Sequence, residues 1–315
     1  MAGLDFEKPI QELEKKIQEL RGFVSDKKID LSSEVKRLEE KLEHLKKATY
    51  LNLSAWQRVQ LARHPQRPYT QDYINMIMSD FIELHGDRSF SDDKAIIGGF
   101  ANIDDQKVLV MGHQKGRDTK ENLKRNFGCA HPEGYRKALR LMQLAEKFNL
   151  PIVIFIDTPG AYPGMGAEER GQAWAIALNL REMTSIAVPI VATIIGEGGS
   201  GGALGIGIAD RVCVLENAYY SVISPEGCAA ILWKNGAKAP DAANVLKLTG
   251  PDLLKMGIID EVIPEPLGGA HTDPEGMGKI LKQAINKNLR ELARLNKDEL
   301  LKLRYAKFRG IGAIG

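Results

Sequence analysis

Apolar runs that end in glycine-rich stretches organise the centre of this chain. The residues from Val188 to Ile195 are mostly apolar and β-branched, which predicts a strand buried on both faces. Ser200 follows, surrounded by glycines at positions 196, 198, 199, 201 and 202, and apolar residues resume at Ala203. We therefore predict a strand that ends in the glycines and a helix that begins after them.

The same design occurs once earlier in the chain. Pro151 to Asp157 has the pattern of a buried strand, and residues 158–166 are rich in Gly and Pro. Residues 167–172 begin a helix with acidic residues in its first turn. Two such units in succession predict neighbouring parallel strands in an α/β sheet, whose carboxyl ends form the usual ligand-binding edge.

The patterns on either side of these units predict the rest of the organisation. Residues 1–48 repeat apolar positions every three or four residues around a polar link at 25–33, which predicts a helical hairpin, either solvated or an arm for assembly. Pro65 and Pro68 predict a linker, so we expect an arm and linker over 1–65 and a main domain over 66–315. The further elements expected are a helix over 72–84, paired strands over 95–103 and 107–113, a helix from 132, strands over 210–215, 218–223 and 258–263, helices from 224 and over 241–257, and a helix over 276–308.

Composition and charge narrow the class of protein. Of the 315 residues, 43% are hydrophobic and 27% charged, which is typical of a soluble globular protein. A net charge of +2 gives no reason to expect nucleic-acid or membrane binding, and we see neither a signal peptide nor a transmembrane run. Cys129, Cys213 and Cys228 are too few and too far apart for a disulfide framework or a zinc site. We predict a cytoplasmic protein that binds no metal.

The glycine-rich stretch before Ala203 also suggests chemistry. The first amides of a helix have no partner inside the helix and lie at its positive end, so they hold negative charge. Glycine lets a ligand approach that backbone closely. We therefore expect this stretch to bind an oxyanion through main-chain N–H groups.

Two motifs compete with that interpretation. Gly196-x-Gly198-x-x-Gly201 fits the dinucleotide fingerprint, with Glu216 near the position of the ribose-binding acid. The segment 198–202, Gly-x-Ser-x-Gly, fits the nucleophile elbow of α/β-hydrolases, for which His271 is the only downstream histidine. A purely structural glycine turn is a further possibility, and the pattern alone leaves all four open.

Two charged features outside the glycines are also candidates. The basic segment 115–125 is either a solvated face or a rim that recognises phosphate or carboxylate. Glu226 is either a general acid–base or an acid that complements the dipole of a helix beginning after Ser224.

Several longer motifs resemble one protein family. The segments 156–164, Ile-Asp-Thr-Pro-Gly-Ala-Tyr-Pro-Gly, and 195–204, Ile-Gly-Glu-Gly-Gly-Ser-Gly-Gly-Ala-Leu, resemble the α-subunit of bacterial acetyl-CoA carboxylase carboxyltransferase. Residues 134–140, 221–227 and 263–271 are similar to the same family. The resemblance extends over essentially the whole chain, and several ordered motifs are more specific than a single glycine pattern.

The resemblance implies a fold and a reaction. The fold is the α/β crotonase-like (ClpP/crotonase) spiral of repeated ββα units, here with the N-terminal helical hairpin. The reaction moves the carboxyl group of carboxybiotin, carried on the biotin carboxyl carrier protein, to acetyl-CoA and gives malonyl-CoA, the first committed step of fatty acid synthesis. A zinc-ribbon β-subunit completes the site in an α2β2 heterotetramer, so zinc belongs to the partner, and ATP is used by the partner biotin carboxylase.

The resemblance also implies which residues act. An enolate of acetyl-CoA and a negative charge on the ureido oxygen of biotin both need pre-placed hydrogen-bond donors. The implied catalytic donors are the backbone amides of Gly201 and Gly202. The implied biotin pocket is lined by Gly160, Ala161, Gly198, Gly199 and Ser200.

Three other functions remain open from the residues. They are a crotonase-type enzyme that acts alone on an acyl-CoA, a hydrolase that uses Ser200, and a non-catalytic scaffold for the carrier protein.

Overall fold

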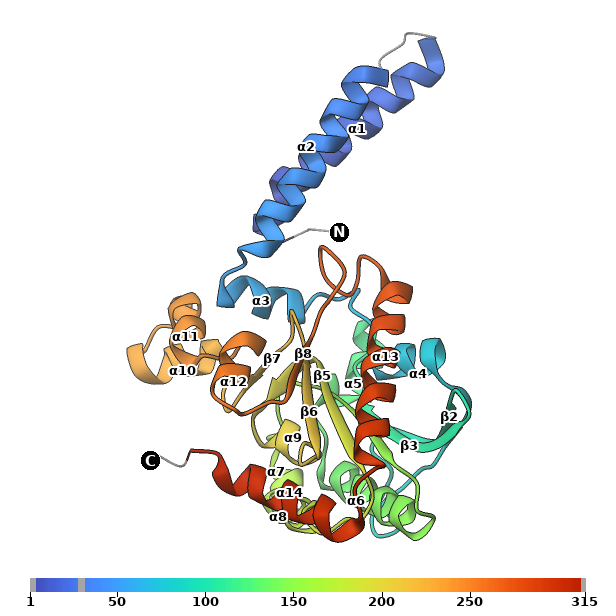
Figure 1. Cartoon of the computed structure of the whole chain (residues 1–315). Coiled ribbons are helices and arrows are strands. Elements are labelled where there is room, and N and C mark those ends of the chain that lie inside the picture. Colours follow the sequence, from blue (N-terminus) through green and yellow to red (C-terminus); the bar gives the residue numbers. More distant parts are fainter. Residues whose placement is uncertain (1–3, 28–31, 313–315) are drawn as a thin grey trace.

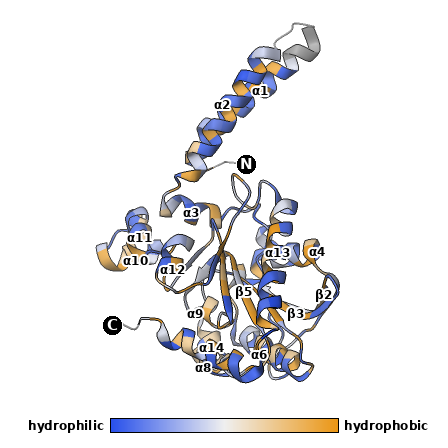
Figure 2. Cartoon of the chain, in the orientation of Figure 1, coloured by the Kyte–Doolittle hydropathy of each residue, from blue (hydrophilic) through white to orange (hydrophobic). Residues whose placement is uncertain are grey.

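The computed structural model describes residues 4–27 and 32–312, which form a helical hairpin and an α/β body (Figure 1). The hairpin pairs α1 (Lys8–Lys27) with α2 (Ser32–Leu51) and projects from the body. Ile10, Ile17 and Leu38 are buried, and Figure 2 shows apolar and polar residues alternating along both helices. This confirms the predicted hairpin, although part of its predicted link, 28–31, lies outside the described residues.

One mixed sheet forms the centre of the body. Its order is β1-β2-β3-β4-β5-β6-β8, and β7 pairs with β5 beside this path. The pairs β1–β2 and β2–β3 are antiparallel, whereas parallel ladders join β3 to β4 and continue through β5 and β6 to β8. The strands are β1 (Ser79–Glu83), β2 (Ile96–Ile103), β3 (Gln106–His113), β4 (Ile152–Thr158), β5 (Ile190–Gly199), β6 (Arg211–Leu215), β7 (Tyr219–Ser221) and β8 (Glu261–Ile263).

Helices cover both faces of this sheet. A side chain on Gly98 of β2 would contact Leu141 of α6, whereas one on Gly112 of β3 would contact Thr70 of α4. Gly98 pairs with Met111, the neighbour of Gly112, and successive strand residues face opposite sides, so α6 and α4 lie on opposite faces. The helices of the body are α3 (Ala55–Ala62), α4 (Thr70–Ile77), α5 (Thr119–Lys124), α6 (Pro132–Lys147), α7 (Met165–Glu169), α8 (Gln172–Met183), α9 (Ser200–Leu204), α10 (Pro225–Trp233), α11 (Ala239–Leu246), α12 (Gly250–Lys255), α13 (Pro274–Leu292) and α14 (Lys297–Gly310).

Three predicted helices differ from those observed. The helix predicted over 72–84 ends at Ile77, and β1 follows, because its backbone pairs with β2 at the sheet edge. The helix predicted from 167 is broken at Gly171, whose φ of 81° is left-handed, so α7 and α8 are separate. The helix predicted over 276–308 is two helices, since Asn296 caps the start of α14.

The base of the hairpin is connected to the body through α3. Val59 and Ala62 of this helix pack in one apolar cluster with Tyr219, Ala243 and Leu248. The division of the chain at residue 65 stays a prediction. None of the helices within 4–27 and 32–312 combines the length and apolar character needed to cross a membrane.

Candidate active site

The glycine-rich stretch is a continuation of the central strand rather than a loop. β5 extends through Gly199 because its glycines keep ladder partners on both sides: Gly198 pairs with Thr158 of β4 and with Tyr220 of β7. The helix α9 then begins at Ser200 and lasts one turn. The predicted break at Gly196 is therefore wrong, and the turn from strand to helix occurs at Ser200.

The two glycine-containing junctions predicted to meet are in backbone contact. A Cβ on Gly202 would lie 2.4 Å from the carbonyl carbon of Gly160 and 2.5 Å from the amide nitrogen of Ala161. A Cβ on Gly199 would lie 2.1 Å from the carbonyl oxygen of Pro159. Only glycine permits this approach. The structure thus brings Gly199 and Gly202 together with Gly160 and Ala161 at the carboxyl edge of β4 and β5.

The amides of Gly201 and Gly202 are available as donors. They belong to the first turn of α9, so they have no partner within that helix. Within residues 4–27 and 32–312, no protein acceptor receives a hydrogen bond from either. Because α9 is a single turn, its dipole adds little, and the individual N–H groups are the donors that matter. A Cβ on Gly201 would meet only Ile176, at 3.7 Å, so this position is open.

A buried ionic network lies at the same edge of the sheet. The Lys115 ammonium donates to Asp157 Oδ1 at 2.7 Å and to Glu197 Oε2 at 2.8 Å. Burial would raise the pKa of Glu197, but the charges of Lys115 and Arg63 outweigh it and lower the pKa to about 2. Burial would lower the pKa of Lys115, but the two carboxylates outweigh it and raise that pKa. The network is therefore charged at neutral pH.

Arg63 extends this network to the surface. Its Nε donates to Glu197 Oε1 at 2.7 Å, and its other nitrogens contact Glu226. The hydroxyl of Tyr219 also donates to Glu197, at 2.8 Å. Glu226 is thus an ion-pair partner as well as a first-turn acid of α10, and its role in chemistry stays a prediction.

The basic segment 115–125 is partly engaged in contacts within the chain and partly exposed. The Lys115 side chain, 12% exposed, is paired within the network, and the exposed Arg117 donates to the carbonyls of Pro65 and Arg67. Lys120 and Lys124 are exposed. The segment is therefore not solvated throughout, and recognition of phosphate or carboxylate by its basic residues stays a prediction.

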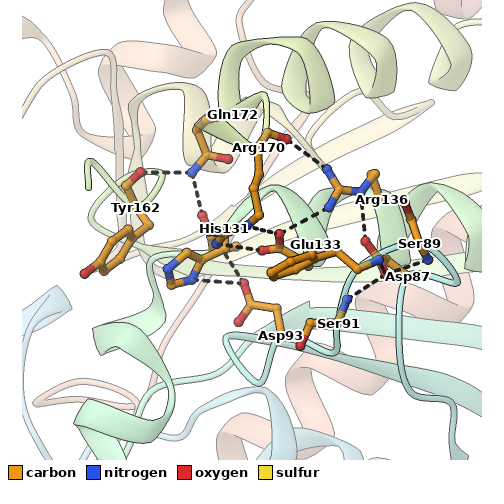
Figure 3. A network of polar contacts seen from close by, with 12 residues as sticks. Asp87, Ser89, Ser91, Asp93, His131, Glu133, Arg136, Tyr162, Arg170 and Gln172 are labelled. Carbon is orange, nitrogen blue, oxygen red and sulfur yellow. Dashed lines mark hydrogen bonds and ion pairs between the residues drawn. The ribbon is translucent and has the colours of Figure 1, made fainter. Parts of the chain in front are cut away.

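A second polar network holds the segment that follows the junction at Gly160 (Figure 3). The side-chain amide of Gln172 donates to the carbonyl oxygens of Ala130, at 2.8 Å, and Tyr162, at 3.0 Å. The ring of Tyr162 stacks on His131, with 4.0 Å between centroids. The backbone amide of His131 donates to Asp93 at 2.6 Å. These contacts fix the segment that follows Gly160 and Ala161.

Figure 3 also shows how this network continues along α6. Glu133 accepts from Arg170 at 2.5 Å and from Arg136 at 3.2 Å, and Arg136 donates to Asp87 at 2.8 Å. Asp87 in turn accepts the backbone amides of Ser89 and neighbouring residues. The charged groups of this network are thus mutually paired.

Neither competing motif is complete, although Ser200 lies at a strained strand-to-helix turn, with a φ of 53°, as in a nucleophile elbow. In the described residues the Ser200 hydroxyl has no hydrogen-bond partner, and His271 stacks on His64, with 3.8 Å between centroids. The structure therefore shows no Ser–His pair. For dinucleotide binding, Gly196 and Gly198 lie within β5 instead of a turn, and a five-residue α9 is no crossover helix. No group of three or more His, Cys, Asp or Glu side chains in the described ranges could hold a metal.

The ionic network at this edge was not predicted from the sequence. Asp157 and Glu197 each follow an apolar strand pattern, and a carboxylate in that position was a usable signal. No local pattern indicated Arg63 or Tyr219, because Arg63 follows α3 and Tyr219 begins β7, and both reach the site from distant parts of the chain. His113 was also missed: burial and then the Lys115 charge lower its pKa to about 3, while the backbone of Gly202 opposes that shift, so the ring is neutral.

Comparison with known sequences identifies similar proteins over the full length. The model of the family described as acetyl co-enzyme A carboxylase carboxyltransferase-like matches residues 3–312. The acetyl-coenzyme A carboxylase carboxyl transferase subunit alpha of Geobacter metallireducens is 58% identical over 306 residues, covering 97% of this chain and 96% of that protein. The subunit of the same name from Thermus thermophilus is 57% identical, covering 98% of each.

Comparison with solved structures concerns the fold. The transcarboxylase 12S core has a TM-score of 0.59 at 19% identity, covering 72% of this chain and 42% of that longer chain. A chain of the Pseudomonas malonate decarboxylase hetero-tetramer has a TM-score of 0.57 at 14% identity, covering 68% and 85%. These likenesses confirm the expected crotonase-like α/β fold.

Proposed function

The chain belongs to the acetyl-CoA carboxylase carboxyltransferase α-subunit family, and from that premise we propose that its backbone amides perform its half of carboxyl transfer. The family transfers a carboxyl group to acetyl-CoA. In our proposal, the amides of Gly201 and Gly202 stabilise an anionic oxygen of the bound carboxyl donor. The observation that carries the proposal is that both amides are free of protein acceptors in the described residues, beside the junction at Gly160.

The donor group we propose is carboxybiotin, carried by a biotin carboxyl carrier protein, which supplies the carboxyl group when bound. The residues at the two amides and at the facing junction are Gly, Ala and Ser, and none of them carries a charge. Gly198 and Gly199 lie at the end of β5, and Ser200 lies at the turn after it. Gly160 and Ala161, which follow β4, border the site on the other side. Gly201 has open space where a side chain would lie, so no side chain blocks the approach of a ligand there. Acetyl-CoA is the acceptor that the family implies.

The ionic network beneath the glycines gives this backbone its rigidity. Asp157 accepts the amide of Glu197 at 2.9 Å, and a Cβ on Gly196 would lie 2.6 Å from Asp157 Oδ1. Lys115 then ties both carboxylates together. Donors that are fixed before the reaction need no reorganisation as charge develops, which is the basis of electrostatic catalysis by an oxyanion hole. We assign the network to positioning, since its members are paired with one another.

A β-subunit with its own zinc ribbon completes the enzyme in this proposal, as an α2β2 heterotetramer. Support comes from exposed apolar residues, Ile231 and Leu232 on α10 and Val245 on α11; Figure 2 shows the apolar colour on α10. Consecutive exposed apolar residues of this kind mark protein interfaces. Cytoplasmic location is part of the same proposal and agrees with three free cysteines.

The experiment uses the chain purified together with the zinc-ribbon subunit, and measures decarboxylation of malonyl-CoA with biocytin as acceptor. Gly201→Val places a branched side chain beside the amides at a position with open space. We expect the rate to fall by about 100-fold or more, the effect of losing one oxyanion donor. Gly310→Val is the matched control, because Gly310 is also open but lies at the end of α14.

Gel filtration of both variants must show normal association of the subunits. Unimpaired turnover by Gly201→Val would remove the role of these amides. Activity of the isolated chain on an acyl-CoA would instead indicate a crotonase-type enzyme that acts alone.

A further inference from the structure

Three consecutive residues near the candidate active site have left-handed backbone. The φ angles are 49° at Asn126, 55° at Phe127 and 81° at Gly128. Glycine adopts this conformation freely, but a bulky residue such as Phe rarely does. The Phe127 ring is 51% exposed, so burial of the ring does not explain the strain. Backbone strain that places an aromatic side chain in solvent indicates a function for that side chain.

The packing of the neighbouring residues holds Phe127 in this conformation. A Cβ on Gly128 would lie 3.0 Å from Lys115 Cγ and 3.1 Å from the carbonyl oxygen of Asp157. The side chain of Asn126 bonds to the His131 ring at 2.9 Å. Because Asp157 is near the carboxyl end of β4, just before the junction at Gly160, Phe127 stands at the rim of the candidate active site.

Phe127 is one of several exposed apolar residues on two segments, 90–94 and 123–127, that border one pocket. Leu123 and Phe90 are 63% and 65% exposed. The guanidinium of Arg125 donates to the carbonyl of Lys94 at 3.2 Å, which joins the segment after α5 to the segment before β2. A pocket of about 220 Å³ lies between the two segments. We define the rim surface as Phe90, Lys94, Leu123, Lys124 and Phe127.

The uncompensated charge of the rim surface is positive. In the described ranges, Lys94 and Lys124 line the pocket and take part in no ion pair. The acids of the same pocket have partners of their own: Glu133 pairs with Arg170, Asp92 pairs with Lys137, and Asp93 accepts the backbone amides of Ala95 and His131. An apolar centre with cations around it is the composition of a protein-docking surface that selects an acidic partner.

We propose that the rim surface docks the carrier domain that delivers the biotin group, and that this domain is acidic around its biotin-bearing lysine. The proposal rests on the proposed function, in which a group tethered to that domain must reach the amides of Gly201 and Gly202. A short tether requires the domain to dock beside the site. Phe127 is then the apolar anchor, and Lys94 and Lys124 attract and orient the domain.

The experiment compares two acceptors with the purified complex of this chain and the zinc-ribbon subunit. One acceptor is the biotinylated carrier domain and the other is free biocytin, which needs no docking. For Phe127→Ala and Lys124→Glu we expect kcat/KM with the carrier domain to fall about tenfold, mainly through KM. With biocytin both variants should stay within about twofold of the wild type. The carrier KM of Lys124→Glu should also depend less on salt.

Two variants on α14 serve as matched controls. Leu303→Ala and Lys302→Glu change an exposed apolar residue and an exposed lysine on another helix, and neither should alter either reaction. An equal loss with both acceptors would place Phe127 within the catalytic site and overturn the docking proposal. Unchanged kinetics with the carrier domain would overturn it too, as would dissociation of the subunits, which would mark the rim surface as a subunit interface.

Failure of this proposal is distinguishable from failure of the proposed function. Gly201→Val acts at the amides and must impair both acceptors alike. If Gly201→Val is inactive with both acceptors while the rim variants are unaffected, only the docking proposal is wrong.

Discussion

The two ends of β5 both carry buried arginine–carboxylate pairs, but they differ in how completely the protein uses these charges. At the amino end, the Arg304 guanidinium contacts Asp210 through Nε and Nη2. Its remaining hydrogens go to the carbonyl oxygens of Met183, Ile186 and Val188. The pair is fully buried, and every donor of the guanidinium has a partner.

At the carboxyl end the arrangement begins in the same way. Arg67 is buried, pairs with Glu265 and donates to the carbonyl of Ile195 at 2.7 Å. Beside it, however, the network of Glu197 continues through Arg63, whose side chain is 30% exposed. The backbone after β5 is also strained, since Ser200 has a φ of 53°.

The difference shows that arginine–carboxylate pairs at the two ends of β5 have different roles. A closed pair at the amino end joins α14 to the sheet and leaves nothing for a ligand. An open network at the carboxyl end fixes the glycine backbone, and the amides of Gly201 and Gly202 have no protein acceptor in the described residues. This agrees with the general placement of ligand sites at the carboxyl ends of parallel strands.

The largest effect on stability is expected at the closed end. Arg304→Met leaves the Asp210 carboxylate buried without its cation, so we expect the free energy of unfolding to fall by about 3–5 kcal/mol. Urea denaturation measures this loss, and Arg309→Met, on the exposed face of the same helix, is the control. Turnover per folded molecule should be unchanged. A loss below about 1 kcal/mol would contradict the structural role of the pair.

A smaller effect, dependent on pH, is expected at the open end. The folded pKa of Glu197 is about 2, below its ordinary value of 4.5, so its ion pairs stabilise the fold above pH 4.5. That contribution is lost as the pH falls toward 2. Between about pH 5 and 3 we expect the wild type to lose about 2 kcal/mol more than Glu197→Gln, which cannot ionise at this position.

The measurement is a series of urea midpoints for both proteins across that pH range. Parallel pH curves for the wild type and Glu197→Gln would show that Glu197 is not held ionised by Lys115 and Arg63. The charges of the network at the carboxyl end would then contribute little to stability, unlike the Arg304–Asp210 pair at the amino end.

The smallest effect is expected at Ser200 itself. Ser200→Ala keeps the backbone of the turn and removes a hydroxyl that has no partner in the described residues. We expect the carboxyl-transfer rate to change by less than about threefold, because the proposed donors are amides. A hydrolase that used Ser200 as nucleophile would lose about 10³-fold or more, and fluorophosphonate labelling would reveal it.

Elements defined by local pattern were predicted well. The hairpin of α1 and α2 and the strands β4 and β5 were recognised because helical spacing and buried apolar runs are visible in short stretches of sequence. The meeting of the two glycine-containing junctions followed from parallel strand topology, and the contact of Gly202 with Gly160 confirms it.

Elements defined by distant partners were not predicted. β1 is a strand because β2 lies beside it, although its residues continued a helical pattern. Lys115 belongs to a basic run that favoured solvent, yet Asp157 and Glu197, 42 and 82 residues away, make it a buried cation. The left-handed backbone at Phe127 likewise follows from the packing of Gly128 against β4.

By itself, the sequence determined which residues form the central strands, that glycines follow them, and which family the chain resembles, since these properties depend on neighbours along the chain. Only the tertiary structure decided that the glycines continue β5, that their amides remain free, and that a buried ionic network supports them. The physical reason is that ladder partners, counter-ions and close backbone contacts come from segments far apart in sequence. These interactions form, and stabilise the protein, only once the sheet has brought those segments together.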